Sequence, residues 1–256
     1  MTEPTSLHDR FSLEGKTALV TGGSRGLGFG MARGLADAGA RVVLVARTEA
    51  AVEAAAREID GLGIAFDVSR TDAVAELVDL AEEAAGAPID LVVHGAGVQH
   101  REEAEYFSAS EWERVVRVNL TAPFALSQEI GRRQLEAGRG GSHLFVGSLT
   151  SLISMPNIAA YTASKSGIYG ITRQLSTEWS GRGIRANAIA PGYYRTELTE
   201  AVFSDPKRYE EMLARIPMGR FGDPDELAGA AVFLLSDASK YLTGQLIAVD
   251  GGWTAA

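Results

Sequence analysis

Short, continuously apolar runs alternate along this chain with longer segments in which apolar residues recur every three or four positions. The short runs predict seven strands, at residues 16–21, 41–46, 62–66, 90–93, 142–146, 184–190 and 245–249. The longer segments predict helices at residues 29–38, 49–59, 71–85, 110–135, 160–180 and 223–235. Strands that alternate with helices and have no polar face predict a parallel sheet covered by helices on both sides.

Two segments depart from this regular alternation. Pro123 falls inside the predicted helix 110–135 and predicts a bend there, because proline lacks the backbone donor that a helix needs. Residues 193–219 are mixed and polar, and predict only short helical pieces. The chain has no linker and no internal repeat, so its 256 residues predict one domain at 8–256 after a flexible tail at 1–7.

The composition excludes several classes of function. The chain has no cysteine, which excludes disulfides, thiolate metal sites and a cysteine nucleophile. Its four histidines are scattered without ligand spacing, so no metal site is predicted. A net charge of −9 without a basic stripe argues against nucleic acid as a partner. No signal peptide and no membrane-length apolar run is visible, and we expect a soluble, cytoplasmic protein.

A glycine-rich turn follows the first predicted strand and opens the first helix. Its spacing is Gly22-x3-Gly26-x-Gly28, with Ser24, Arg25 and Leu27 between the glycines. Glycines allow a tight turn and a close approach of the backbone to a pyrophosphate, which then rests on the N-terminus of the helix. In this context the turn predicts binding of a dinucleotide. It is not a P-loop, because no Gly-Lys-Ser/Thr sequence follows.

Tyr161 and Lys165 stand four residues apart in a predicted helix, so their side chains share one face, with Cβ atoms roughly 6 Å apart. A phenol has a pKa of about 10, and an adjacent ammonium favours its ionised form. Bringing that pKa to about 7 takes roughly 4 kcal/mol, which we expect from Lys165, a second positive group and partial desolvation. Ser148 follows the end of the fifth predicted strand and lies 13 residues before Tyr161.

Polar or glycine features follow the carboxyl ends of five predicted strands. They are the glycine turn, Asp67 with Val68, Ala96-Gly97, Ser148 and Pro191-Gly192. Ligands of open parallel sheets bind along that edge, so these features predict one shared crevice.

Taken in order, these residues resemble the short-chain dehydrogenase/reductase family over essentially the whole chain. The resemblance implies a Rossmann-type, doubly wound, seven-stranded parallel sheet and a nicotinamide cofactor. It implies that Tyr161 exchanges a proton with the carbinol oxygen, that Lys165 lowers its pKa and binds the nicotinamide ribose, and that Ser148 binds the substrate oxygen. Asn119 is implied to hold a water that links Lys165 to solvent, and Thr196 to contact the cofactor. The turn after the fourth strand departs from the family pattern, because His94-Gly95 replaces the usual asparagine.

Residues at the end of the second strand predict the choice of cofactor. NAD-preferring sites place a carboxylate there, but this chain has Ala46 followed by Arg47, and Glu49 opens the next helix. A guanidinium binds a 2′-phosphate through charge-assisted hydrogen bonds, and Arg25 can reach the same phosphate. The sequence therefore predicts NADP(H) rather than NAD(H).

Short sequence segments around the turns resemble those of the sugar-acid branch of the family, the gluconate and deoxygluconate dehydrogenases. Gln99, His100 and Arg101 follow the fourth strand, where a substrate carboxylate could be met, and Tyr193 follows the sixth-strand turn. The second candidate is a 3-oxoacyl thioester reductase, for which Arg139 and Arg182 could meet an acidic carrier protein. A catalytically silent cofactor sensor is a third candidate, disfavoured because Tyr161 and Lys165 are both present. The resemblance also implies a homodimer or homotetramer that packs through helices 110–135 and 160–180.

Overall fold

The computed structural model describes residues 6–256, and its centre is one parallel sheet of seven strands in the order β3-β2-β1-β4-β5-β6-β7. The strands are β1 (Thr17–Thr21), β2 (Arg41–Ala46), β3 (Leu62–Ala65), β4 (Leu91–His94), β5 (Gly141–Val146), β6 (Ile184–Pro191) and β7 (Leu246–Val249). Every strand predicted from the apolar runs is present, and the predicted doubly wound α/β fold is confirmed.

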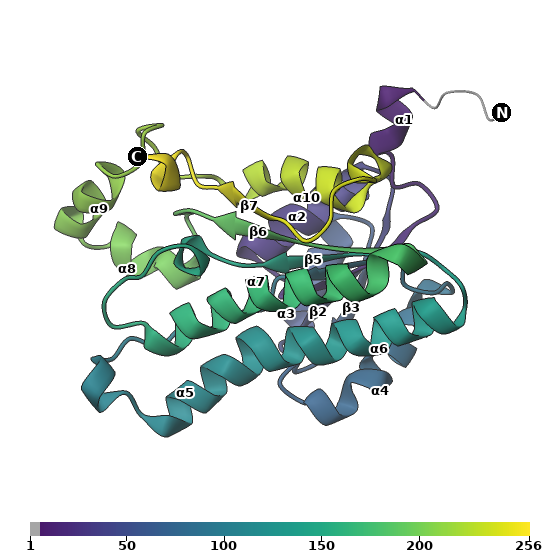
Figure 1. Cartoon of the computed structure of the whole chain (residues 1–256), viewed down its shortest axis with the longest axis horizontal. Helices are drawn as coiled ribbons and strands as arrows, with labels where there is room; N and C mark the ends of the chain where they lie inside the picture. The colour runs from purple at the N-terminus through teal and green to yellow at the C-terminus, as the bar shows by residue number, and fades with distance from the viewer. Residues whose placement is uncertain (1–5) are drawn as a thin grey trace.

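Helices cover both faces of this sheet (Figure 1). They are α1 (Leu7–Phe11), α2 (Gly26–Asp37), α3 (Glu49–Glu58), α4 (Val74–Ala85), α5 (Ala109–Val116), α6 (Ala122–Glu136), α7 (Ala159–Trp179), α8 (Glu200–Phe203), α9 (Pro206–Leu213) and α10 (Ala228–Leu235). Helices α2, α3 and α10 share one apolar core with the sheet. On the other face, α4 and α6 pack in a second core, and α7 packs on β5 and β6 in a third.

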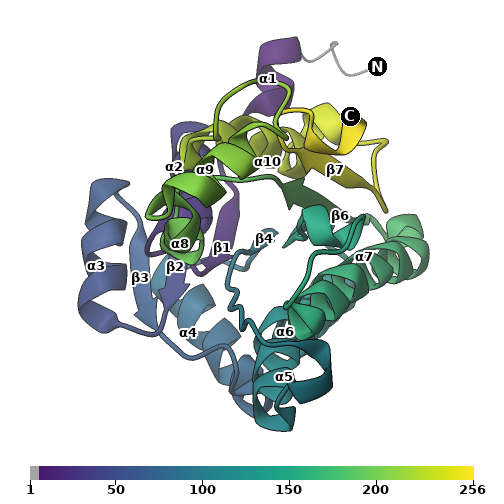
Figure 2. The same cartoon turned by 90° about the vertical axis from the view of Figure 1, so that its left-hand side faces the viewer.

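The strand order reverses direction between β1 and β4, which are neighbours in the sheet although two other strands separate them in the sequence. After β1 the chain adds β2 and β3 toward one edge of the sheet, and after β4 it adds β5, β6 and β7 toward the other edge. A crevice forms at such a switch point, outside the carboxyl ends of the strands. Figure 2 views the molecule from the side where α8 and α9 lie in front of the sheet.

The predicted helix 110–135 is interrupted by a π-helical turn. This turn spans Arg117–Thr121 between α5 and α6, and the amide of Ala122 donates to the Arg117 carbonyl, five residues back. Pro123 follows at once, and its missing N–H removes the ordinary donor to the carbonyl of residue 119. Such turns recur at functional sites, and this one contains Asn119, whose side chain is buried.

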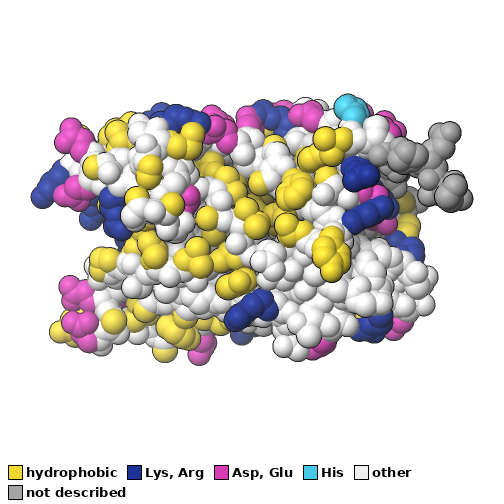
Figure 3. All heavy atoms as spheres, turned by 45° about the horizontal axis from the view of Figure 1, so that its top comes forward, with side chains coloured by type: hydrophobic (Ala, Val, Ile, Leu, Met, Phe, Trp, Pro, Cys, Tyr) yellow, Lys and Arg dark blue, Asp and Glu magenta, His cyan; other side chains and the backbone are white. Residues whose placement is uncertain are grey.

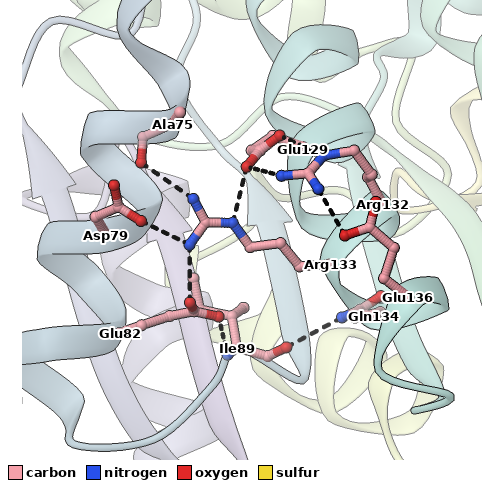
Figure 4. A network of polar contacts seen from close by, with 9 residues as sticks. All are labelled: Ala75, Asp79, Glu82, Ile89, Glu129, Arg132, Arg133, Gln134 and Glu136. Carbon is pink, nitrogen blue, oxygen red and sulfur yellow. Dashed lines mark hydrogen bonds and ion pairs between the residues drawn. The ribbon is translucent and has the colours of Figure 1, made fainter.

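An ion-pair network ties α4 to α6 and reaches the start of β4 (Figure 4). The Arg133 guanidinium lies 2.8 Å from an oxygen of Asp79 and 3.0 Å from one of Glu82, both on α4. On α6 itself it lies 2.8 Å from a carboxylate oxygen of Glu129. Gln134 donates to the Ile89 carbonyl over 3.1 Å, so the network also fixes the entry into β4.

The structure differs from the sequence prediction mainly at element ends. Helix α2 begins at Gly26 rather than at residue 29, because the glycine turn itself forms the first helical turn. Of the predicted tail 1–7, residues 1–5 lie outside the described part, while Ser6 caps α1 by accepting from the Asp9 amide. The segment 193–219 contains short helices, as predicted. Within residues 6–256, no helix is long and apolar enough to span a membrane.

Candidate active site

A cleft of about 1390 Å³ opens along the carboxyl edge of the sheet. All residues predicted to bind the cofactor line it: Gly22, Ser24, Arg25, Gly26, Leu27, Gly28, Ala46, Arg47, Asp67, Val68, Ala96, Gly97, Tyr161, Lys165, Pro191, Gly192 and Thr196. Of the other predicted site residues, Gln99, Arg101, Ser148 and Tyr193 also line it, whereas His100 and Asn119 do not. The predicted crevice therefore exists, and nearly all of the predicted residues meet in it.

The glycine turn brings the backbone close to the cleft. Gly22 has φ +64°, and a Cβ there would lie 2.7 Å from backbone atoms of Ala96, so only glycine fits. The N-cap of α2 is Arg25, and within residues 6–256 no side chain accepts a hydrogen bond from the first amides of this helix. Uncapped amides at the N-terminus of a twelve-residue helix suit a pyrophosphate, so this turn fits the dinucleotide that the sequence predicts.

Tyr161 and Lys165 lie on the first turns of α7 and face the end of β5. The Lys165 ammonium is buried, donates to the Val146 carbonyl over 2.7 Å and lies 5.6 Å from the centre of the Tyr161 ring. Ser148 begins the turn after β5, and its hydroxyl accepts from the Thr150 amide over 3.2 Å. A hydroxyl, a phenol and an ammonium thus meet at one point of the cleft wall.

The pKa of Tyr161 does not follow the expectation from the sequence. Burial raises the pKa of this phenol above its ordinary value of 10.0, and only the hydrogen bond with Ser148 lowers it in part. Burial also lowers the pKa of Lys165 to about 8. Counting desolvation among the stabilising contributions was wrong, because burial disfavours the charged form of either group. In the protein by itself, the phenol is the stable form of Tyr161 near neutral pH.

The Asn119 side chain forms hydrogen bonds with the backbone of Val98, which lines the cleft. Its side-chain oxygen accepts from the Val98 amide and its nitrogen donates to the Val98 carbonyl, each over 2.8 Å. The same nitrogen donates to the Ser164 hydroxyl over 3.2 Å. Asn119 therefore fixes the chain directly after Gly97 and links it to α7. Its role as a holder of water remains a prediction.

His94, the departure from the family pattern, is buried and belongs to a polar chain. Its Nε2 lies 2.7 Å from the Ser127 hydroxyl, which lies 3.0 Å from Nδ1 of His143. Nε2 of His143 lies 3.1 Å from the Gln134 side-chain oxygen, which can only accept, so this nitrogen carries the proton. Ser127 must then donate to His143 and accept from His94, which leaves Nδ1 of His94 unprotonated. Burial lowers the pKa of His143 to about 3 and that of His94 well below 6.5.

At the adenosine end, Ala46 and Arg47 line the cleft where β2 ends. Arg47 is exposed, and among residues 6–256 no carboxylate lies within ion-pair distance of it. Arg25 differs, because its guanidinium pairs with Glu197 over 2.6 Å. The side chain of Asp67 accepts from the Ser69 amide over 2.9 Å and orders the turn after β3.

At the opposite end, the structure separates two residues that the sequence grouped together. Arg101 is exposed and lines the cleft, whereas His100 lies outside it. The ring nitrogens of His100 lie 3.3 Å from Glu102 and 3.4 Å from Glu111. These two carboxylates hold His100 in the loop structure, so it is not placed to meet a ligand in the cleft.

The residues tied to the thioester alternative also lie outside the cleft. Arg139 pairs with Asp90 over 3.5 Å at the start of β4. Arg182 is exposed and donates to the Glu178 carbonyl over 3.3 Å at the end of α7. Both lie at the amino edge of the sheet, away from Tyr161.

Sequence reasoning missed Arg215 and Met155, which also line the cleft. Trp253 does not line the cleft but packs behind its wall, since it is 4% exposed and its ring centre lies 5.1 Å from that of Tyr193. These residues come from the loop after β5, the segment 193–219 and the C-terminus. No local pattern marks them, because only the folded chain brings these three segments together.

Comparison with known proteins identifies the family. A family described as enoyl-(acyl carrier protein) reductase matches residues 22–254. A 2-dehydro-3-deoxy-D-gluconate 5-dehydrogenase of Bacillus subtilis (strain 168) is 43% identical over 251 residues, covering 96% of this chain and 98% of the relative. A gluconate 5-dehydrogenase of Gluconobacter oxydans (strain 621H) is 40% identical over 251 residues, covering 96% and 97%.

Among solved structures, the gluconate 5-dehydrogenase of Burkholderia cenocepacia J2315, in complex with NADP and tartrate, has a TM-score of 0.93 at 38% identity and covers 98% of this chain and 100% of its own. The chain is an oxidoreductase that belongs to the short-chain dehydrogenase/reductase family.

Proposed function

We propose that this enzyme interconverts a secondary alcohol and a ketone on a sugar acid, with NADP(H) as the cofactor and Tyr161 as the general acid and base. The observation that carries the proposal is the meeting of Tyr161, Ser148 and Lys165 in a cleft that has a phosphate-binding turn at one end and Arg101 at the other. The relatives that act on gluconate and deoxygluconate support the substrate class.

A nicotinamide cofactor held by the glycine turn and Lys165 would supply hydride transfer to and from the carbinol carbon, which the side chains of this protein cannot provide. Tyr161 takes the proton from the alcohol oxygen, or donates it to the ketone oxygen in the reverse direction. Ser148 donates a hydrogen bond to the same oxygen and orients it. Lys165 is already buried next to Tyr161, and its positive charge favours the phenolate that alcohol oxidation requires. The rate of oxidation should therefore rise with pH.

NADP(H) is the proposed cofactor because the end of β2 offers a cation and no carboxylate. Arg47 is exposed at the cleft, free of ion pairs with the described residues, and can form a bidentate pair with a 2′-phosphate. Arg25 can contribute only by giving up its ion pair with Glu197. The Burkholderia gluconate 5-dehydrogenase was solved with NADP, which supports the choice.

A sugar acid is the proposed substrate because Arg101 lines the cleft and has no carboxylate within ion-pair distance among residues 6–256. Burial raises the pKa of Tyr193, and the positive charge of Arg101 opposes that rise. Tyr193 in turn lies close enough to Tyr161 to affect the pKa of that group. Arg101 and Tyr161 line the same cleft, so a substrate whose carboxylate is bound by Arg101 would lie in the cleft with Tyr161. The tartrate in the Burkholderia structure is a hydroxy dicarboxylate of the same chemical class.

A substrate screen tests this function. The purified enzyme is assayed with NADP⁺ and NAD⁺ on hexonates, on the matching hexitols and on neutral secondary alcohols, and in reverse on 3-oxoacyl thioesters. We expect the highest kcat/KM with a hexonate and NADP⁺. A higher kcat/KM for 3-oxoacyl thioesters would instead establish the alternative reaction.

We also propose that the protein is a homodimer or homotetramer. Trp112 on α5 and Phe124 on α6 are 42% and 39% exposed, although both are large and apolar. Strand β7 is an edge strand whose residues all stay partly exposed, and Tyr241 before it is fully exposed. Hydrophobic side chains gather across the middle of the face in Figure 3. Light scattering of the purified protein tests this, and a monomer at micromolar concentration would contradict it.

A further inference from the structure

We propose that Arg215 binds the substrate's carboxylate together with Arg101, and that the buried ring of Trp253 holds its guanidinium in position. This inference rests on the proposed function, since it identifies which residues at that site recognise a sugar acid. Arg215 follows α9, 114 positions after Arg101 in the numbering of the chain, and both side chains line the same cleft.

Arg215 is held by stacking rather than by an ion pair. Its guanidinium carbon lies 4.4 Å from the centre of the Trp253 ring. That ring is 4% exposed and packs with Leu149 and Ile216 in a small apolar core. A guanidinium over an aromatic face keeps its N–H groups free at the edge, where a planar carboxylate can accept two parallel hydrogen bonds. The position is thus fixed before any ligand arrives.

The charges of Arg101 and Arg215 are unneutralised in the part of the chain that the structure describes. Neither guanidinium has an Asp or Glu oxygen within 4.0 Å. Of the other arginines that line the cleft, three are neutralised: Arg25 pairs with Glu197, Arg114 with Glu111 and Arg208 with Asp205. Arg47, Arg117 and Arg195 also line it without such a partner among residues 6–256. An arginine pair left without counter-ions at a cleft fits an anionic ligand.

Both cations lie at the reacting end of the cleft. Burial raises the pKa of Tyr193, and the positive charges of Arg101 and Arg215, which line the cleft with it, oppose that rise. The centre of the Tyr193 ring lies 5.1 Å from that of the Trp253 ring at an angle of 32°, so Trp253 contacts both Arg215 and Tyr193. Burial raises the pKa of Tyr161, and Tyr193 contributes to the same rise. Arg47 lies by the glycine turn at the other end of the cleft. An anion bound by Arg101 and Arg215 would be either the substrate's carboxylate or a phosphate of the cofactor. Because the glycine turn and Arg47 lie at the other end of the cleft, the geometry favours the carboxylate.

The test compares Arg215→Met with Arg173→Met. Arg173 also stacks on an aromatic ring, with its guanidinium carbon 4.8 Å from the Tyr169 ring centre, but it lies outside the cleft. We measure KM for a hexonate and for the matching hexitol, the dissociation constant of NADP⁺, and the dissociation constant of tartrate for the enzyme–NADP⁺ complex.

For Arg215→Met we expect KM for the hexonate and the tartrate dissociation constant to rise at least tenfold. KM for the hexitol and the NADP⁺ dissociation constant should stay within twofold, and Arg173→Met should match the native enzyme. An equal rise for hexonate and hexitol, or a rise confined to NADP⁺, would overturn the inference while leaving the proposed function intact. If the native enzyme oxidises no hexonate, the proposed function fails, and tartrate binding that depends on Arg215 still supports the inference. Tartrate binding that is absent or independent of Arg215 overturns it.

Discussion

Acid should destabilise this protein through the buried histidine chain, and His143 gives the effect a size. In the folded state its side chain is fully buried and its pKa is lowered to about 3, from an ordinary value of 6.5. The unfolded state therefore takes up a proton first as the pH falls below about 6.5. Stability is lost from that pH downward, and the loss ends only near pH 3, where the folded state takes up the proton as well.

The magnitude follows from the two pKa values. Between pH 7.5 and pH 5.0, His143 alone should lower the free energy of unfolding by about 2 kcal/mol. His94 shifts in the same direction, because burial also lowers its pKa. A loss of this size is a large part of the stability of an ordinary domain. His94 directly precedes the turn at Gly95 to Gly97, so the cofactor site should be lost together with the fold.

Urea unfolding at pH 7.5 and at pH 5.0 measures the effect, at one protein concentration throughout. His143→Leu removes the acceptor of the Ser127 hydroxyl proton and the donor to the Gln134 side-chain oxygen, and it should be less stable than the native protein at both pH values. Its loss of stability between the two pH values should nevertheless be smaller by about 2 kcal/mol. His8→Gln, which changes an exposed histidine on α1, should retain the full native pH dependence. An unchanged pH dependence in His143→Leu would refute the reasoning.

Two further substitutions probe the cofactor end. Arg47→Asp replaces the proposed phosphate ligand by a carboxylate. Because charge-assisted hydrogen bonds contribute roughly 1.5–3 kcal/mol, the ratio of kcat/KM for NADP⁺ over that for NAD⁺ should fall at least tenfold. An unchanged ratio would show that Arg47 contacts no phosphate. Gly22→Ala places a Cβ 2.7 Å from the Ala96 backbone at φ +64°, so it should lower the free energy of unfolding by roughly 1–3 kcal/mol and weaken cofactor binding. Thermal unfolding with and without NADP⁺ measures both effects, and native values would contradict the close contact.

What the sequence predicted well is local. The spacing of Tyr161 and Lys165 is a property of one helix, and Ser148 was located by the end of one apolar run. The glycine turn and Arg47 likewise follow directly from neighbouring strands. These residues line one cleft because parallel strands present their carboxyl ends at one edge of the sheet.

What could not be predicted depends on contacts between distant segments. Trp253 reaches Tyr193 and Arg215 only after the C-terminus and segment 193–219 fold over the cleft. The bonds from Ser127 to His94 and His143 join α6 to β4 and β5. Burial is equally invisible in a spacing, which is why the direction of the Tyr161 pKa in the protein by itself was wrong.

The central claim is that Tyr161 carries the proton in alcohol oxidation. The most direct test is kcat for hexonate oxidation with NADP⁺ in Tyr161→Phe, which removes only the phenolic oxygen, together with the NADP⁺ dissociation constant. General acid–base catalysis contributes roughly 10²–10⁴-fold, so kcat should fall at least a hundredfold while NADP⁺ binding changes little. A Tyr161→Phe enzyme that binds NADP⁺ normally and keeps the native kcat would contradict the account.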